Sequence, residues 1–245
     1  MDGKIIRFNR ISMNGKILSV PLDHGFTNGP ISRLSKFREL TEVVIENGAT
    51  AIIVHKGMVR FLPPLKNSGL IIHISASTEY YNEVNKNLVC DVQEALKYGA
   101  DAVSVHVNIG NSYEQTMLRD FSIISNQCKD FGVPLLAMMY FRNNENTTFY
   151  DEKLLIHSVR IAVELGADIV KVPYCEDDNC LKNIIASSPI PIIFAGGKKS
   201  QDDELLQRTQ KIMSFGAFGI SFGRNIFESP SPEKIIATLR KIVIQ

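Results

Sequence analysis

Short apolar runs recur along the whole chain, and segments with helical periodicity separate them. The runs are rich in β-branched residues and almost continuously hydrophobic, as is typical of strands buried on both faces of a parallel sheet. They lie at residues 16–25, 51–57, 69–77, 102–108, 134–140, 168–174, 191–197 and 219–227. The stretch between the second and third runs is the shortest, and we expect it to hold only a turn of helix. The pattern predicts a succession of β–α units.

A local motif repeats before every second run. It consists of a helix end, a glycine, an alanine and then a strand, with the glycine at a position typical of the left-handed residue that ends a helix. The glycines are Gly48, Gly99, Gly166 and Gly216, and Gly132 belongs to a looser fifth copy. Each interval between the four clear copies therefore holds two β–α units. This repetition favours a closed (β/α)₈ TIM barrel formed by residues 1–245 as a single α/β domain.

An open doubly wound sheet is the alternative architecture. The first run is not followed by the GxGxxG motif with which such sheets bind dinucleotides, so we prefer the barrel.

Composition narrows the range of functions. The 245 residues carry a formal net charge of +1, so we expect no nucleic-acid partner. No apolar stretch approaches the roughly 18–20 residues of a membrane span, and the first residues lack the features of a signal peptide. We therefore expect a cytoplasmic protein without a membrane partner.

The cysteines show no metal-ligand spacing. They are Cys90, Cys128, Cys175 and Cys180, with no CxxC pair and no histidine partners. We predict four reduced thiols, no metal site and no cofactor.

Polar residues collect where the predicted strands end, and four of the five histidines are among them. In a barrel these ends carry the active site. The residues are Asp23, His24, His55, Lys56, His73, His106, Asn108, Tyr140, Lys171, Tyr174, Gly196, Gly197 and Arg224. By contrast, His157 has the position of an ordinary helix residue.

Lys171 is the strongest single indication of chemistry. It interrupts the apolar run DIVKVPY, where a solvated lysine does not belong. Burial disfavours the charged form of an amine, and a neutral amine can attack a ketone to form an iminium. The alternative is a structural lysine paired with a buried carboxylate.

Two further residues are candidates for proton transfer. Asp23 follows the first run and is a candidate general base or charge partner of Lys171, or else a structural carboxylate that caps a loop. Tyr140 ends the fifth run and is a candidate proton donor to a sugar oxygen, or else a packing residue.

The last two strand ends indicate anion binding. Gly196 and Gly197 place backbone N–H groups where they can converge on an oxyanion, and Gly223 precedes Arg224, whose guanidinium suits phosphate. Glycine turns and a surface arginine are the alternative. His24, His55 and Lys56 are further candidates for substrate binding, and the roles of His73 and His106 stay open. The Asn-rich segment 142–152 is predicted to be a long β–α loop on the same face.

Motifs over nearly the whole chain resemble those of the archaeal-type class I aldolase family (DeoC/FbaB-like). They are, in order, VPLDHGFTNGP, IIVHKGMVR, GLIIHIS, GADAVSVHVNIG, PLLAMMY, GADIVKVPY, FAGG and GISFGRNIF. The resemblance implies a Schiff base on Lys171, proton transfer by Asp23 and Tyr140, and phosphate binding by the last two glycine motifs. It also implies a homo-oligomer, often a decamer in that family.

Within this family the motifs are most similar to those of the heptulosonate synthase branch. The resemblance implies a phosphorylated keto-sugar as donor, aspartate semialdehyde as acceptor and an alternative route to 3-dehydroquinate. Fructose-bisphosphate aldolases of the family usually carry a Trp at the position of Met138, and this chain has none. The family's usual Tyr-Pro-Arg-Gly is here Tyr140-Phe141-Arg142-Asn143, a departure that bears on the acceptor rather than on the lysine chemistry.

Four alternatives remain at this level. Two lie inside the family: a fructose-bisphosphate aldolase, and an enzyme that condenses dihydroxyacetone phosphate with aspartate semialdehyde for aminohydroxybenzoate synthesis. The other two are a barrel that binds a sugar phosphate as a sensor and a metal-dependent lyase.

Overall fold

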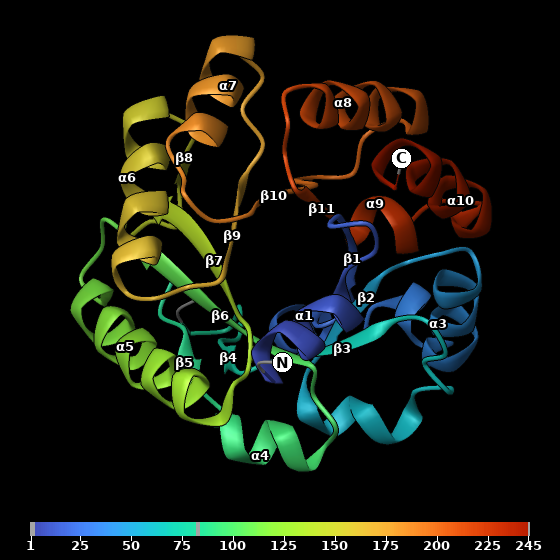
Figure 1. Cartoon of the computed structure of the whole chain (residues 1–245), viewed down its shortest axis with the longest axis horizontal. Coiled ribbons are helices and arrows are strands. Elements are labelled where there is room, and N and C mark those ends of the chain that lie inside the picture. The colour runs from blue at the N-terminus through green and yellow to red at the C-terminus, as the bar shows by residue number, and fades with distance from the viewer. Residues whose placement is uncertain (1–2, 82–83, 245) are drawn as a thin grey trace.

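The computed structural model describes residues 3–81 and 84–244, and within them eight parallel strands close into a barrel. Each strand pairs with the next along the chain, and the last pairs with the first (Figure 1). The strands are β1 (Ile17–Pro21), β2 (Ala51–Val54), β3 (Gly69–His73), β6 (Ala102–Ile109), β7 (Leu135–Arg142), β9 (Ile169–Pro173), β10 (Ile192–Ala195) and β11 (Gly219–Ser221). The predicted TIM barrel is confirmed.

Helices surround the ring of strands, as Figure 1 shows. The outer helices are α3 (Phe37–Glu46), α4 (Val92–Lys97), α5 (Glu114–Phe131), α6 (Glu152–Glu164), α7 (Asp178–Ala186), α8 (Asp202–Ser214) and α10 (Pro232–Val243). Short elements complete the chain: α2 (His24–Asn28), η1 (Ser32–Leu34), η2 (Lys56–Phe61), β4 (Ser75–Ala76), β5 (Asn87–Leu88), β8 (Thr148–Phe149) and α9 (Arg224–Phe227). The predicted short connection between the second and third strands is the 3₁₀ helix η2. None of the helices in the described residues is long and apolar enough to cross a membrane.

The glycines of the repeated motif do end helices. Gly48, Gly99, Gly166 and Gly216 have φ values of 103°, 84°, 87° and 92°. These values lie in the region that favours glycine, so the motif was interpreted correctly.

The end of the barrel where the strands begin, here called the lower end, is apolar, and the upper end, where the strands finish, is polar. Helix α1 (Gly3–Ile11) closes the lower end, where Phe8 and Ile11 pack with inward side chains of the strands. Inward positions alternate along each strand. On β9, Ile169 belongs to this inner core and the next inward residue is Lys171. The fold therefore places polar side chains at the end of the barrel where the strands finish.

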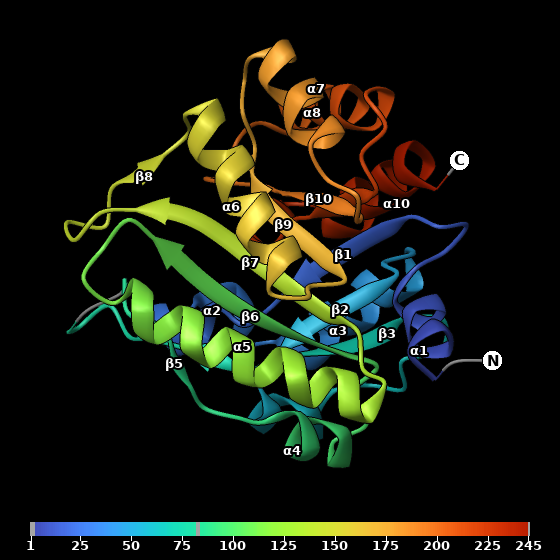
Figure 2. The ribbon, with the colours of Figure 1, turned by 60° about the vertical axis from the view of Figure 1, so that its left-hand side comes forward.

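The segment 142–152 connects β7 to α6, as predicted, and it contains a short hairpin. Strand β7 continues to Arg142 and pairs antiparallel with β8, so that Arg142 lies opposite Thr148 (Figure 2). Asn146 adopts φ 61° in the intervening turn, a conformation that asparagine tolerates. The asparagines therefore form the turn of a hairpin within the predicted β–α loop.

Two cysteines differ from the prediction. Cys175 follows β9 and Cys180 lies in the first turn of α7, and the tight connection brings their Cα atoms to 6.4 Å so that they form a disulfide. The prediction of reduced thiols is wrong for this pair. Cys90 and Cys128 are free and buried, and burial raises the pKa of each thiol to about 12.

Candidate active site

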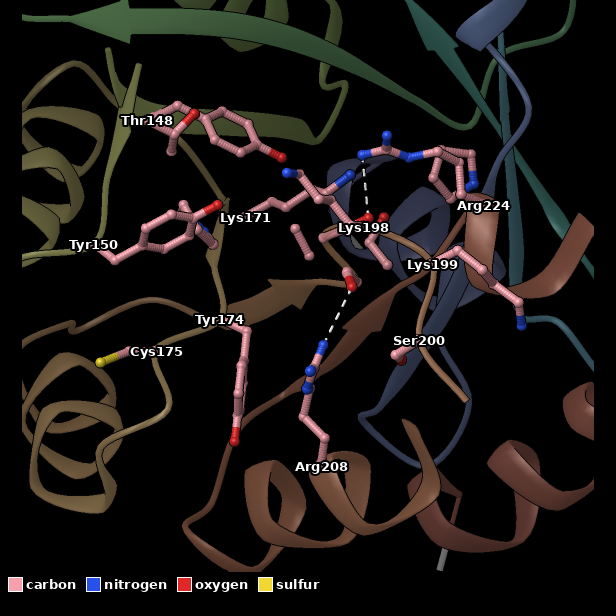
Figure 3. Close-up of a pocket in the computed structure, with 18 of the residues that line it drawn as sticks. Thr148, Tyr150, Lys171, Tyr174, Cys175, Lys198, Lys199, Ser200, Arg208 and Arg224 are labelled. Carbon is pink, nitrogen blue, oxygen red and sulfur yellow. Dashed lines mark hydrogen bonds between the residues drawn. The ribbon is translucent and has the colours of Figure 1, made fainter. Parts of the chain in front are cut away.

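A cavity of about 1130 Å³ opens at the upper end of the barrel. Residues at the ends of β1, β7, β9, β10 and β11 line it, together with the β7–β8 hairpin. Figure 3 shows Lys171 and Arg224 pointing into the same space, with Thr148 and Tyr150 on the side opposite Arg224. The cavity therefore lies where the sequence predicts the chemistry.

Lys171 occupies the middle of β9. It is paired in register with Met138 on β7 and Ile193 on β10, and only 6% of its surface is exposed. Both partners belong to the apolar inner core below it. The side chain is thus held by strands on both sides, while its amine reaches the cavity.

The carboxylate of Asp23 lies among histidines. Its oxygens lie 3.6 Å from His24 Nδ1 and 3.8 Å from His73 Nε2. Burial works against the charged carboxylate, but the surrounding histidines, led by His73, and Lys171 favour it, and the pKa of Asp23 falls to about 2. Asp23 is therefore an anion at neutral pH, suited to accept a proton or to stabilise a nearby cation.

His73 and His55 are neutral neighbours of that anion. Burial lowers the pKa of His73 to about 3, although Asp23 opposes the shift. His73 Nδ1–H donates to the Ser104 carbonyl at 3.1 Å, with Ser104 Oγ 2.9 Å away, and Nε2 lies 3.8 Å from Asp23. Burial also lowers the pKa of His55, whose Nδ1–H donates to the His73 carbonyl at 2.9 Å. Both imidazoles are therefore uncharged at neutral pH, and backbone carbonyls fix their orientation.

These shifts predict a loss of stability in acid. A pKa of about 3 for His73 lies below the ordinary 6.5, so its contribution is complete above pH 6.5 and is lost as the pH falls towards 3. Asp23, at about 2 instead of 3.8, adds its own loss below pH 4. Over the pH range in which it titrates, each group changes the free energy of unfolding by up to about 1.4 kcal/mol per pH unit. This corresponds to roughly 3–5 °C in the melting temperature. Measuring the melting temperature as a function of pH tests the prediction.

A matched pair of variants isolates the histidine. His73→Asn is expected to flatten the slope of melting temperature between pH 6.5 and 4.5, whereas His157→Asn, on the exposed side of α6, leaves it unchanged. An equal slope in both variants would contradict this assignment.

Tyr140 is held by two neighbours. Its ring lies 4.7 Å from the His106 ring and 5.0 Å from the Arg142 guanidinium carbon. Asn108 donates its amide N–H to the Val84 carbonyl, which turns the amide oxygen towards His106 and makes Nε2 the protonated nitrogen, 2.9 Å away. Burial, helped by Lys86 and Arg142, keeps the pKa of His106 well below its ordinary value. The geometry gives His106 a role in fixing the phenol ring.

The glycine loops that follow the neighbouring strands β10 and β11 contact each other beside the cavity. Arg224 Nη2 donates to the Gly197 carbonyl at 3.1 Å (Figure 3). Asn225 Nδ2 donates to the Gly196 carbonyl at 2.9 Å. A Cβ on Gly223 would lie 2.5 Å from His24 Cε1, so only glycine allows His24 to pack there. The structure thus brings together the five predicted residues Gly196, Gly197, Gly223, Arg224 and His24.

The other two substrate-binding candidates lie outside the cavity lining. His55 stands behind the carboxylate of Asp23, with its ring against Phe26 and His73. Lys56 Nζ lies 2.8 Å from both carboxylate oxygens of Glu94 in α4, and these hydrogen bonds raise the pKa of Lys56. We therefore leave Lys56 out of the proposed site and give His55 a supporting position.

Sequence reasoning missed three polar residues of this region. Arg208 reaches in from α8, with Nη1 3.4 Å from the Gly196 carbonyl and the guanidinium over the Tyr174 ring. Asn225 anchors the glycine loop, and its position directly after Arg224 was the available signal. Arg142 stood in a family motif but received no role. Nothing in the sequence around Arg208 distinguishes it from other helix residues.

Three residues that line the cavity carry buried polar atoms without hydrogen-bond partners. They are His24 Nδ1, Arg142 Nε and Ser221 Oγ. Buried polar groups in folded proteins are almost always paired, so the grouping of such atoms around one cavity favours a polar molecule as their partner there. In the described residues, no group of three or more His, Cys, Asp or Glu side chains is arranged to hold a metal ion.

Fold and site together define the class of the protein: a (β/α)₈-barrel enzyme that acts on small molecules at the ends of its strands. Residues 17–229 match the DeoC/LacD family aldolases, and the chain belongs to that family.

Two curated relatives extend the comparison. The 2-amino-3,7-dideoxy-D-threo-hept-6-ulosonate synthase 1 of Archaeoglobus fulgidus is 40% identical over 99% of this chain and 92% of its own length. The 2-amino-4,5-dihydroxy-6-oxo-7-(phosphonooxy)heptanoate synthase of Streptomyces griseus is 37% identical over 93% and 85%. The family that the motifs suggested is confirmed.

Solved structures share the fold. An archaeal fructose-1,6-bisphosphate aldolase with its catalytic Lys bound to a carbinolamine intermediate superposes with a TM-score of 0.91 at 23% identity, over 99% of this chain and 100% of that one. A structure of a Schiff-base-forming fructose-1,6-bisphosphate aldolase gives 0.90 at 24%, over 98% and 99%.

Proposed function

We propose that the protein is a class I aldolase or transaldolase in which Lys171 forms a Schiff base with a phosphorylated keto-sugar. The observation that carries the proposal is an amine, 6% exposed, that reaches a polar cavity within electrostatic range of the Asp23 anion. Family membership supports the same reaction class.

The reaction follows from the positions of these groups. The Lys171 amine attacks the ketone carbon, and the carbonyl oxygen leaves as water after two proton transfers, which gives an iminium. The bond that breaks joins the carbon next to the iminium carbon to the following carbon, which carries a hydroxyl. Its electron pair moves into the iminium to form an enamine, and the hydroxyl on the departing carbon gives up its proton so that this carbon becomes an aldehyde. Addition to an acceptor aldehyde is the reverse sequence, and water then releases the product from Lys171.

Two side chains handle the protons in this scheme. Tyr140, on the strand next to Lys171, exchanges a proton with the oxygen of the departing or entering aldehyde. Asp23, an anion at neutral pH, stabilises the iminium and accepts protons while it forms. The scheme needs no cofactor, since the iminium accepts the electron pair of the broken C–C bond and the enamine holds it.

The substrate's phosphate is assigned to the glycine loops. Gly196, Gly197 and Gly223 offer backbone N–H groups, and Arg224 supplies positive charge. His24 lies against Gly223 and completes this side. Phosphate binding there is remote from the reacting carbons and orients them on Lys171.

The two curated relatives point to the acceptor. Their names describe seven-carbon amino keto acids, one of which carries a phosphonooxy group. We propose aspartate semialdehyde as the acceptor and a phosphorylated keto-sugar as the donor, in an alternative route to 3-dehydroquinate. Cleavage of fructose 1,6-bisphosphate is the second candidate, supported by the fold of the solved aldolases.

A product assay separates these candidates. The protein is incubated with aspartate semialdehyde and, in turn, a deoxy-keto-sugar phosphate, dihydroxyacetone phosphate and fructose 1,6-bisphosphate, and new products are identified by mass. A seven-carbon amino keto acid is expected. Release of triose phosphates from fructose 1,6-bisphosphate without use of aspartate semialdehyde would favour the second candidate.

Assembly and location are also predictions. The family resemblance implies a homo-oligomer, often a decamer in that family, and the sequence features predict a cytoplasmic protein. Light scattering coupled to size-exclusion chromatography measures the assembly directly, and a monomer at micromolar concentration would contradict it.

A further inference from the structure

Ser221 places a buried hydroxyl on the cavity wall between Lys171 and the glycine loops. In the barrel, Ser221 on β11 is level with Ala195 on β10, which is level with Pro173 on β9. All three residues line the cavity. Pro173 lies two residues beyond Lys171 on the same strand, and the first glycine loop begins directly after Ala195. This level therefore separates the amine from the glycine loops, and of its three residues Ser221 alone has a polar side chain.

The Ser221 hydroxyl is unpaired within the part of the chain that the structure describes. The residue is 1% exposed, and its Oγ has no hydrogen-bond partner there. Ser19, level with it on β1, is also buried, but its hydroxyl donates to the Ile220 carbonyl at 3.4 Å and it lies outside the cavity lining. An unpaired buried hydroxyl costs stability, which an apolar side chain would avoid. The hydroxyl of Ser221 therefore suits a ligand that brings its own oxygen.

We propose that the Ser221 hydroxyl donates a hydrogen bond to an oxygen on the donor carbon that lies next to the ketone on the glycine-loop side. The inference rests on the proposed function, in which the ketone carbon is bonded to Lys171 and the phosphate lies at the glycine loops. The donor chain between these two points passes the level of Ser221. Donors with a hydroxyl or a phosphate ester on that carbon are therefore preferred over donors with a methyl group there.

The preference has a physical origin in the buried hydroxyl itself. An oxygen on the donor carbon gives the Ser221 hydroxyl its partner. A methyl group in the same place would cover the hydroxyl, exclude water and leave it unpaired. A site built to bond an oxygen rejects the analogue that lacks this oxygen more strongly than an apolar pocket rejects an added one. Ser221 is thus a specificity-determining residue, and the proton transfers stay with Tyr140 and Asp23.

Trapping of ketones on Lys171 with borohydride tests the proposal in Ser221→Ala. Dihydroxyacetone phosphate and dihydroxyacetone carry an oxygen on both carbons next to the ketone, whereas acetone carries none. The concentration for half-maximal trapping is expected to rise about 5- to 20-fold for at least the phosphorylated ketone and to change less than about twofold for acetone. An equal rise for acetone would overturn the proposal, because Ser221 would then act on the amine. Unchanged trapping of both oxygen-bearing ketones would overturn it as well.

Ser19→Ala is the matched control, because it removes a buried hydroxyl at the same level of the barrel but outside the cavity lining. It is expected to leave half-maximal trapping of all three ketones within about twofold of the wild type. Weaker trapping of the oxygen-bearing ketones in Ser19→Ala as well would overturn the inference, since the loss would then come from packing between β1 and β11.

Thermal melting keeps the inference independent of the covalent step. Without ligand, Ser221→Ala is expected to melt at the wild-type temperature or up to about 2–4 °C higher, since alanine removes the unpaired hydroxyl. Dihydroxyacetone phosphate is expected to raise the melting temperature less in this variant than in the wild type. An equal rise in both proteins, or no rise in the wild type, would overturn the inference. Failure of the proposed function would instead appear as a wild-type protein that forms no adduct on Lys171.

Discussion

Replacing Lys171 with methionine is expected to lower turnover by at least about 10⁴-fold, because the other amines that line the cavity, Lys198 and Lys199, are exposed loop residues and not buried in a strand. Methionine fills similar volume between β7 and β10 and suits the apolar surroundings of the strand. The melting temperature is therefore expected to stay within a few degrees of the wild type, and to rise if the buried amine is costly. Steady-state turnover and thermal melting measure the two effects.

Lys198→Met is the matched control. Lys198 also lines the cavity, but it lies in the loop after β10 and not inside a strand. This variant is expected to keep the covalent chemistry and at most to weaken binding of the phosphorylated donor. Substantial turnover in Lys171→Met, or loss of adduct formation in Lys198→Met, would contradict the assignment of the reactive amine.

Tyr140→Phe is expected to slow turnover about 10²- to 10⁴-fold, the usual contribution of a positioned acid or base. The phenyl ring keeps the contacts with His106 and Arg142, so the loss belongs to the hydroxyl. Schiff-base formation is expected to persist, because Tyr140 is assigned to C–C bond cleavage, the step in which the departing hydroxyl gives up its proton. Single-turnover kinetics separate adduct formation from release of the aldehyde.

Tyr98→Phe serves as the control for loss of a phenol. Tyr98 ends α4 far from the cavity lining and is 43% exposed. Its turnover is expected to match that of the wild type. If Tyr140→Phe formed the adduct slowly but cleaved it at the normal rate, Tyr140 would serve the first step instead of the second.

The barrel was predictable because its local signals are independent of distant contacts. A glycine such as Gly166 ends its helix whatever the rest of the chain does, and a continuous apolar run such as 168–174 suits only a strand covered on both faces. The hairpin at 142–152 was not predictable in this way. A turn rich in asparagine has the composition of a loop, and only pairing with β7 makes β8 a strand.

The site was predictable where a residue contradicts its surroundings. Lys171 breaks an apolar run, and Asp23 and Tyr140 stand at strand ends, so the barrel places them together. Arg208 could not be found in this way, because a charged residue on an amphipathic helix is ordinary in sequence. It becomes part of the site only when α8 packs against β11 and the side chain reaches the Gly196 carbonyl. The disulfide depends on the path of the β9–α7 connection, which spacing alone does not give.

Borohydride reduction of the wild-type protein with a phosphorylated keto-sugar, followed by peptide mass mapping, tests the central claim most directly. The donors tried are dihydroxyacetone phosphate, fructose 1,6-bisphosphate and a deoxy-keto-sugar phosphate. The account predicts that at least one of them forms a single stable adduct, on Lys171. An adduct on another lysine, or none with all three donors, would contradict it.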